Sequence, residues 1–125
     1  RITSSNVTGL NANDRLRHYI ENARREDVVF WQETKLRSTK LPQLRSLWKH
    51  HEGVFLSSAL QGSRRGVVTL FSPRLQAEQL DVRIDDLGQF IVNVTRIDGA
   101  ILMFINLYGD PDTDANSLET LTSAD

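Results

Sequence analysis

Apolar residues follow strand and helix spacings in turn through the first half of the chain. Residues 2–7 predict a short strand before the turn-prone pair Thr8-Gly9, and the continuous apolar run at residues 28–31 predicts a strand covered on both faces. After each strand, apolar residues return every three or four positions, which predicts a helix. These positions are Leu16, Tyr19, Ile20 and Ala23 in the first helix, after an N-cap at Asn13 or Asp14, and Leu41, Leu44, Leu47 and Trp48 in the second.

After Gly53 the pattern changes to strands separated by turns. Asp98-Gly99 lies between two apolar segments and predicts a tight hairpin, because both positions accept a positive φ. The segment after this turn carries few polar residues, so we expect it to lie centrally in a sheet. A further helix is expected to begin within residues 114–124. The predicted strands are residues 54–58, 67–71, 80–84, 90–97 and 101–108.

The order β-α-β-α followed by an antiparallel run predicts an α/β sandwich with mixed β-sheets. The chain has 125 residues, 39% of them hydrophobic, and no repeat or linker divides it, so we expect one structural unit with a packed core. The absence of cysteine excludes thiolate metal sites and cysteine nucleophiles. No apolar run approaches the roughly 18 to 20 residues of a membrane span, so no membrane is expected among the partners.

Charge is unevenly distributed along the chain. Residues 1–50 hold ten basic and five acidic side chains, a net charge of +5, whereas residues 51–125 hold five basic and eleven acidic ones, a net charge of −6. Solvated faces of one fold would produce this pattern, and so would a basic edge that meets phosphate. Arg64 and Arg65 are open to the same two interpretations, as a solvated hairpin tip or as a grip on a nucleic-acid backbone.

Polar residues at the ends of the first two predicted strands are candidates for chemistry. Asn6 either starts the following turn through a local hydrogen bond or faces a ligand. Glu33 follows the second strand, at the end where α/β sheets place ligands. A carboxylate at the edge of an apolar core is costly unless it is paired or binds a metal. Glu33 therefore either pairs with a basic residue such as Lys35 or Arg37, or coordinates Mg²⁺.

The most apolar strand also ends in polar residues, at Asn106-Leu107-Tyr108. Tyr108 offers a phenol that would stabilise charge on a phosphate oxygen in a transition state. The alternative is a tyrosine at the edge of the core with a satisfied hydroxyl group. Asn106 is expected to brace the end of the strand.

Four segments of the chain together carry a resemblance to a known family: Asn6-Val7-Thr8-Gly9-Leu10, Gln32-Glu33-Thr34-Lys35, Arg65-Gly66-Val67-Val68 and Asn106-Leu107-Tyr108. In this order they resemble the N-terminal half of the endonuclease/exonuclease/phosphatase superfamily, and most of all the endonuclease domain of non-LTR (LINE-type) retrotransposons. The match at Glu33 is the most specific. In the segment that begins at Arg65, an arginine replaces the first glycine of the family's Gly-Gly-Val-Ala strand.

The resemblance implies that residues 1–125 are the N-terminal portion of one such domain, part of a four-layer α/β sandwich whose mixed β-sheets are flanked by helices. It implies an Mg²⁺- or Mn²⁺-dependent endonuclease that nicks double-stranded DNA and leaves a 3′-hydroxyl primer, in the nucleus of a host cell. Glu33 and Asn6 would hold the metal, and Tyr108 would contact the phosphate. Lys35, Arg64 and Arg65 would contact the DNA backbone.

The resemblance also implies that half of the chemistry lies outside these residues. The family's later Gly-Asp-x-Asn and Ser-Asp-His elements do not occur in this sequence, so the chain alone is expected to be inactive. An apurinic/apyrimidinic endonuclease or another phosphoesterase of the superfamily is one alternative. A half-domain used for binding or assembly without catalysis is another. We expect a half-sandwich to expose apolar surface and to pair with the missing C-terminal half or with a second copy.

Overall fold

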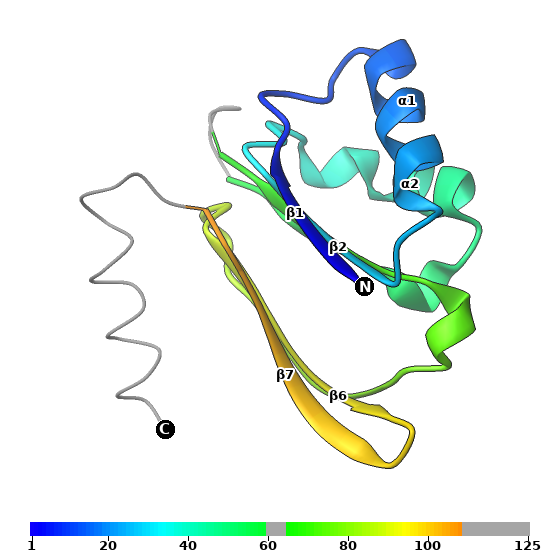
Figure 1. Cartoon of the computed structure of the whole chain (residues 1–125). Coiled ribbons are helices and arrows are strands. Elements are labelled where there is room, and N and C mark those ends of the chain that lie inside the picture. Colours follow the sequence, from blue (N-terminus) through cyan, green and yellow to red (C-terminus); the bar gives the residue numbers. More distant parts are fainter. Residues whose placement is uncertain (60–64, 109–125) are drawn as a thin grey trace.

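The computed structural model describes residues 1–59 and 65–108, which form two β-sheets and two α-helices (Figure 1). The elements follow the order predicted from the sequence, while the helix expected within residues 114–124 lies outside the described residues. The helices and strands are β1 (Ile2–Asn6), α1 (Asn13–Ala23), β2 (Val28–Gln32), α2 (Leu41–Trp48), β3 (Val54–Ser57), β4 (Val67–Phe71), β5 (Glu78–Ile84), β6 (Phe90–Ile97) and β7 (Ala100–Leu107), with short 3₁₀ turns η1 (Ser38–Lys40), η2 (His51–Gly53) and η3 (Pro73–Leu75).

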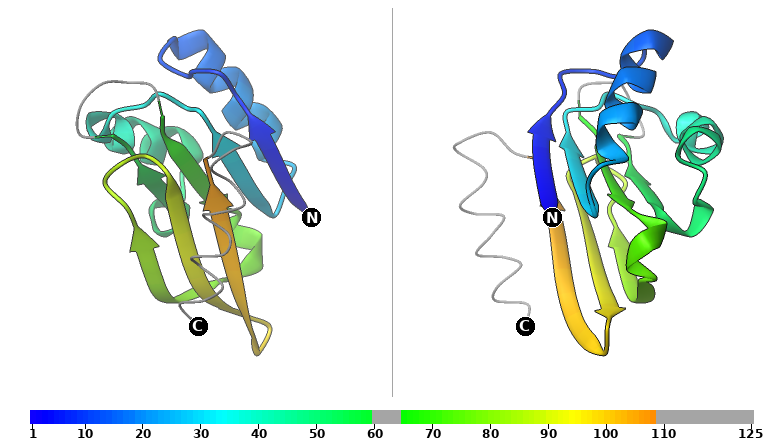
Figure 2. Two further views of the ribbon diagram at one scale, coloured as in Figure 1. Left: turned by 90° about the vertical axis from the view of Figure 1, so that its left-hand side faces the viewer. Right: turned by 45° about the vertical axis from the view of Figure 1, so that its right-hand side comes forward.

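The first sheet has the order β1-β2-β4-β3, with β1 parallel to β2 and the other pairs antiparallel. It is therefore a mixed sheet, as expected. Both helices lie on the same side of it (Figure 2). Their apolar stripes pack on one face of the sheet, where Leu16, Leu44 and Trp31 are buried. This burial explains why the helical spacing of the sequence predicted α1 and α2 correctly.

The second sheet, β5-β6-β7, packs against the other face of the first sheet. Aromatic side chains fill part of the space between the sheets, and the rings of Phe71 and Phe104 meet edge to face at 5.3 Å. The described residues thus form a helical layer and two sheet layers, which confirms the predicted α/β sandwich. Because β2 lies between the helices and the second sheet, Val28, Val29 and Trp31 are all buried.

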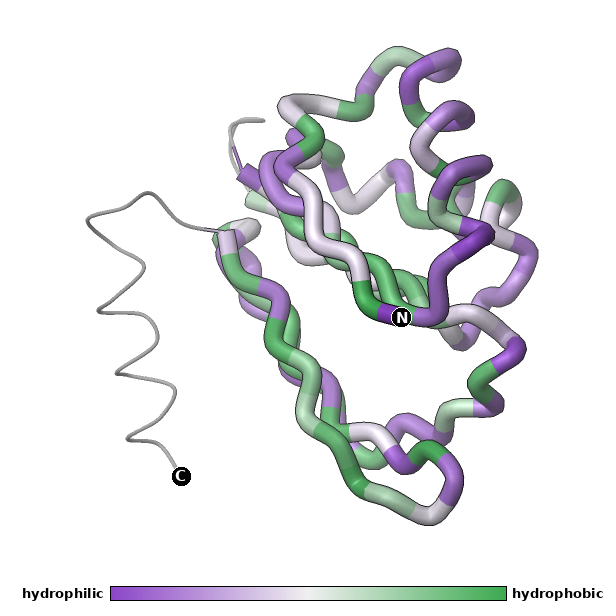
Figure 3. Tube along the Cα trace, viewed as in Figure 1, coloured by the Kyte–Doolittle hydropathy of each residue, from purple (hydrophilic) through white to green (hydrophobic). Residues whose placement is uncertain are grey.

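The expectation that the last strand is central in its sheet is wrong for the described residues. β7 pairs with β6 along one side only and forms an edge of the second sheet. Ile101 and Met103 are 60% and 54% exposed, and the hydropathy colouring follows this apolar segment along the hairpin (Figure 3). Contacts across the sandwich account for part of the apolar character of β7, because Phe104 is buried between the sheets. Association of the exposed surface with another half or a second copy stays a prediction.

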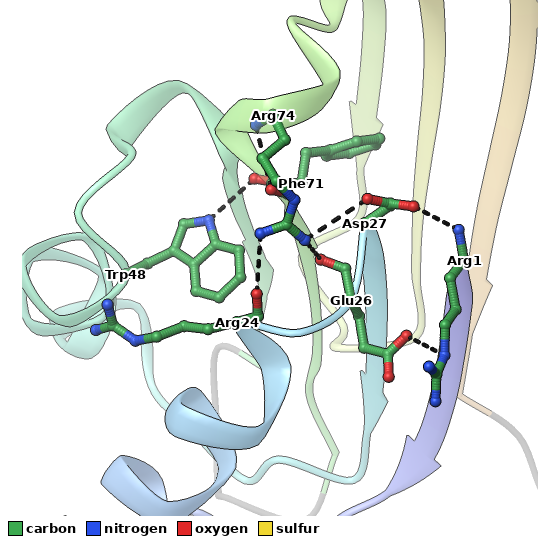
Figure 4. Close-up of polar contacts among 8 residues, drawn as sticks. Arg1, Arg24, Glu26, Asp27, Trp48, Phe71 and Arg74 are labelled. Atoms are coloured by element: carbon green, nitrogen blue, oxygen red, sulfur yellow. Dashed lines mark hydrogen bonds and ion pairs between the residues drawn. The ribbon is translucent and has the colours of Figure 1, made fainter.

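A group of polar contacts joins the elements at the end of the first sheet where β1 and β2 begin (Figure 4). The indole of Trp48 donates a hydrogen bond to the carbonyl oxygen of Phe71 at 3.0 Å. Arg74 donates to the carbonyl oxygens of Arg24 at 3.1 Å and Glu26 at 2.9 Å. These contacts connect the end of α1 with the end of β4. None of the described helices has the length and apolar character needed to cross a membrane.

Candidate functional site

The C-terminal ends of β1 and β2 lie side by side because the two strands are parallel. Asn6 stands opposite Gln32 in the register, and the backbone N–H of Val7 donates to the carbonyl oxygen of Gln32 at 3.0 Å. Glu33 is the next residue along the chain. Asn6 and Glu33 therefore lie at the same end of the first sheet.

The backbone around Glu33 is held from both sides. The N–H groups of Gly9 and Leu10 donate to the carbonyl oxygens of Glu33 and Thr34 at 2.8 and 2.9 Å. From the other side, the N–H groups of Thr34 and Lys35 donate to the loop before β4 at 3.0 and 2.9 Å. Glu33 and Lys35 both have positive φ, 55° and 58°. Such conformations are unfavourable for side chains with a Cβ and persist only where the surroundings impose them.

Gly66 is the point of closest approach between this segment and β4. It accepts the N–H of Thr34, and its φ is +125°. A Cβ at Gly66 would lie 2.6 Å from the Thr34 hydroxyl oxygen and 3.2 Å from the backbone nitrogen of Lys35. Only glycine fits here, which gives a physical reason for the glycine of the Arg65-Gly66-Val67-Val68 segment.

The Glu33 carboxylate lies 3.8 Å from the ammonium nitrogen of Lys35, and the two side chains are 25% and 39% exposed. At this distance and exposure an ion pair stabilises a protein by only about 0 to 1 kcal/mol. The salt bridge considered from the sequence is therefore present but weak. It leaves the carboxylate oxygens accessible to a cation, so both interpretations of Glu33 remain open.

Asn6 makes the local hydrogen bond that a turn-starting residue is expected to make. Its Oδ1 accepts the backbone N–H of Thr8 at 3.1 Å. Within the described residues, this contact uses the acceptor oxygen and leaves the Nδ2 donor for a ligand. The two interpretations of Asn6 are therefore compatible.

A cleft of about 360 Å³ opens between the ends of β1 and β2 and the end of β7. It brings Asn6 and Tyr108 together, although they lie on different sheets. Glu33, Lys35 and Arg65 are not among its lining residues. The cleft is lined by Ser4, Asn6, Phe30, Gln32, Ile105, Leu107 and Tyr108.

Lys35 and Arg65 lie beside each other at this end of the molecule, since the N–H of Lys35 donates to the carbonyl oxygen of Arg65 at 2.9 Å. Arg65 is exposed. Arg64 lies outside the described residues. Two of the predicted DNA-contacting residues are thus neighbours near Glu33.

Gln32 is a lining residue to which the sequence assigned no role of its own. Its amide nitrogen donates to Asn106 Oδ1 at 2.8 Å and to the Ser4 hydroxyl at 3.0 Å. Side chains alternate between the two faces of a strand, so the sequence of β2 places Gln32 on the same side as Phe30. What the sequence did not reveal was the partner on β7, which is 74 positions away.

The donor set can be compared with the needs of Mg²⁺. Within residues 1–59 and 65–108, no group of three or more His, Cys, Asp or Glu side chains is placed to hold a metal ion. Mg²⁺ is usually bound by one or two carboxylates together with water and substrate phosphate. Glu33 offers one carboxylate, which fits a site of that kind and not a closed protein cage.

No family model matches the chain, and no curated protein matches it. Among solved structures, it is similar to a humanised D. rerio TDP2 carrying 14 mutations, with a TM-score of 0.57 and 20% sequence identity. The chain has the endonuclease/exonuclease/phosphatase type of fold. The alignment covers 98% of this chain and 56% of the TDP2 chain, so the chain spans about half the length of that structure.

Proposed function

We propose that the chain is the N-terminal portion of a metal-dependent DNA-nicking endonuclease domain, of the kind found in non-LTR retrotransposons. The observation that carries the proposal is the placement of Asn6 and Glu33 on neighbouring parallel strand ends, with Tyr108 facing Asn6 across a cleft. Backbone strain at Glu33, imposed from two sides, supports a functional role for that residue. The endonuclease would act in the nucleus.

In this proposal each residue has a distinct task. Glu33 would hold Mg²⁺ or Mn²⁺, which when bound polarises the scissile phosphodiester and stabilises the leaving oxygen. Asn6 would donate its free Nδ2 to a phosphate oxygen, and Tyr108 would donate its phenol to another. Lys35 and Arg65 would contact neighbouring phosphates of the duplex and orient it over the cleft.

Among the described residues, the cleft lining contains no histidine and no carboxylate. His18 contacts Asn22 and His50 contacts Glu52, and neither lines the cleft. A general base and an orienting carboxylate would come from polypeptide beyond the segments matched here, as the resemblance implies. The chain alone is accordingly expected to bind metal and DNA without nicking.

The experiment measures Mn²⁺ binding by electron paramagnetic resonance and duplex DNA binding by fluorescence anisotropy. We expect Glu33→Gln to raise the Kd for Mn²⁺ at least about tenfold and to abolish the gain in DNA affinity that Mn²⁺ produces. Asp27→Asn, at the other end of β2, is the matched control and should leave both values unchanged. If Glu33→Gln binds Mn²⁺ and DNA like the unaltered chain, the metal-dependent proposal fails.

One observation favours a second candidate, a half-domain that binds DNA without catalysis. Glu33 is paired with Lys35 and does not line the cleft. This candidate predicts DNA binding that is independent of Mn²⁺ and lost in Lys35→Glu or Arg65→Glu. The same titrations therefore separate the two candidates. Comparing intact with abasic duplex in the anisotropy assay also tests the apurinic/apyrimidinic alternative, which predicts preference for the abasic DNA.

A further inference from the structure

One arginine side chain holds the turn that follows β1. Arg15, in the first turn of α1, donates from Nε to the carbonyl oxygen of Gly9 at 2.8 Å. Its Nη2 donates to the carbonyl oxygen of Val7 at 2.6 Å and to the hydroxyl oxygen of Thr8 at 3.1 Å. The planar guanidinium group carries its donors in a fixed fork, so these three bonds also fix the direction of each acceptor. Arg15 therefore holds the backbone on both sides of Thr8.

Thr8 has a backbone conformation that it would not adopt by itself. Its φ is 50°, in a region that residues with a Cβ occupy only where the surroundings impose it. The N–H groups of the residues before and after Thr8 donate to the end of β2 and the residue that follows it, at 3.0 and 2.8 Å. The N–H of Thr8 itself donates instead to Asn6 Oδ1 at 3.1 Å. The bonds from Arg15 and from β2 together impose this conformation.

The Thr8 N–H decides which way the Asn6 amide faces. A backbone N–H can only donate, so the Asn6 atom that meets it must be the oxygen. The nitrogen Nδ2 is then the atom left for a ligand, and Asn6 lines the cleft. Nδ2 is a donor, which suits the acceptor oxygens of a phosphodiester. If the Thr8 backbone relaxed from its positive φ, its N–H would turn away and the Asn6 amide would be free to rotate.

Arg15 occupies a position that the helix itself does not favour. The first turn of a helix lies at the positive end of its dipole, where a cation is destabilising. Contacts outside the helix backbone hold the guanidinium group in place. Its Cζ lies 5.4 Å from the centroid of the Tyr19 ring, and Tyr19 packs edge to face on the buried Trp31 at 5.9 Å. The guanidinium group is thus anchored to the core on one side and to the turn on the other.

We propose that Arg15 is a positioning residue for the cleft, which acts through the Thr8 backbone to present Asn6 Nδ2 to a DNA phosphate. The proposal rests on the phosphate contact of Asn6 in the proposed function, and it requires no metal. Arg15 is exposed, so the competing role is a direct contact between its own charge and the DNA backbone. A direct contact depends on the charge of the side chain, whereas positioning depends on the shape of the guanidinium group.

The test measures binding of a fluorescent DNA duplex to the 125-residue chain by anisotropy in EDTA. Asn6→Ala should raise the Kd about tenfold, as expected for the loss of a hydrogen bond to a charged group. Arg15→Lys keeps the charge, but one ammonium nitrogen cannot reproduce the fork, so the Kd should rise by about three- to tenfold. Arg17→Lys is the matched control, because Arg17 lies on the same helix and lines the groove between α1 and α2. Its Kd should equal that of the unaltered chain.

A double-mutant cycle tests whether Arg15 acts through Asn6. In the Asn6→Ala background, Arg15→Lys should cause no further loss of DNA affinity. The salt dependence of binding is a second measurement, because removal of a direct phosphate contact lowers the slope of log Kd against log salt by about one. Arg15→Met should leave this slope unchanged. Additive losses in the cycle, or a slope lowered by about one, would overturn the proposal.

Nuclear magnetic resonance follows the Asn6 amide directly and without DNA. The side-chain amide signal of Asn6 should move in Arg15→Lys and stay in place in Arg17→Lys. Circular dichroism checks that each variant is folded, and Arg15→Met replaces Arg15→Lys in the titrations if the latter unfolds. An Asn6 amide signal that is identical in Arg15→Lys and in the unaltered chain would contradict the proposal.

The outcomes separate this inference from the proposed function. If Asn6→Ala weakens DNA binding while Arg15→Lys binds like the unaltered chain, the inference is wrong and the Asn6 contact stands. If neither substitution changes DNA binding, both are wrong. If both weaken binding and their effects are not additive, both are supported. The Mn²⁺ titration of Glu33→Gln tests the metal part of the proposed function independently of these variants.

Discussion

The two ends of β2 carry acidic residues in contrasting surroundings. Before the strand, Asp27 pairs with the terminal ammonium group of Arg1 at 2.6 Å and with the guanidinium of Arg74 at 3.6 Å (Figure 4). After the strand, Glu33 has Lys35 at 3.8 Å as its cationic partner among the described residues. The hydrogen bond from the terminal ammonium group, and then the charge of Arg74, hold the pKa of Asp27 below its ordinary value against the opposing effect of desolvation. The negative charge at the Asp27 end of β2 is thus neutralised by its partners. The Glu33 carboxylate at the other end keeps the capacity to accept a hydrogen bond or a cation.

The backbone conformation also differs between the two ends of β2, and the strained residues lie at the Glu33 end. Thr8, Glu33 and Lys35, all beside the cleft end, have φ values of 50°, 55° and 58°. Each such residue costs on the order of 1 kcal/mol relative to an unstrained conformation. Positive φ elsewhere falls at routine places, for example the C-cap of α2 and the hairpin turn at Asp98. The contrast indicates that the Asp27 end serves stability, and the strain retained at the Glu33 end supports the role proposed for that residue.

The largest expected effect on stability comes from a substitution that disturbs the backbone at the Glu33 end of β2. Gly66→Ala places a Cβ 2.6 Å from the Thr34 hydroxyl oxygen at a φ of +125°. We expect a loss of about 3 kcal/mol in the free energy of unfolding, because the substitution adds a steric clash to an unfavourable φ. Urea denaturation followed by tryptophan fluorescence measures it.

Gly99→Ala is the matched control for this substitution. Gly99 also has a positive φ, +79°, but a Cβ there would meet nothing within 4 Å. Its expected cost is about 1 kcal/mol, from the backbone conformation alone. Equal costs for the two variants would mean that the contact between β4 and the Glu33 segment is not tight.

An intermediate effect is expected at the opposite end of β2. Arg74→Met keeps the aliphatic packing of the side chain and removes its hydrogen bonds to the carbonyl oxygens of Arg24 and Glu26. The expected loss is about 1 to 2 kcal/mol in the free energy of unfolding, with no change in Mn²⁺ affinity. Arg83→Met is the control, since Arg83 is 75% exposed and, within the described part of the chain, pairs only with Asp81 at 3.5 Å. A change in Mn²⁺ affinity on Arg74→Met would contradict the separation of the two ends.

Local patterns predicted the elements well because each pattern reflects a local physical constraint. Helical spacing of apolar residues identified α1 and α2, and Asp98-Gly99 adopted the positive φ values, 51° and 79°, expected of a tight hairpin. The placement of Asn6 beside Glu33 followed from the parallel pairing of β1 and β2.

Long-range pairing was the part that local patterns did not predict. The apolar sequence of β7 predicts a central strand, but apolar residues also arise from packing between sheets, and β7 lies at an edge of the described sheet. The bond between Gln32 and Asn106 joins positions on different sheets, so neither residue carried a local indication of it. The positive φ of Glu33 likewise depends on hydrogen bonds from Gly9 and from the segment before β4.

The smallest expected effect, and the one of opposite sign, comes from Glu33 itself. Glu33→Gly removes a weak ion pair and places the residue type that best tolerates a φ of 55°. We expect the free energy of unfolding to rise by about 0.5 to 1 kcal/mol, while Mn²⁺ binding is lost. Glu33→Gln keeps the strained backbone and should change stability by less than about 0.5 kcal/mol. Both values come from urea denaturation without metal.

Destabilisation by Glu33→Gly beyond that of Glu33→Gln would mean that the Glu33 side chain supports the fold, as Arg74 does at the other end. The contrast between the two ends of β2 would then be lost.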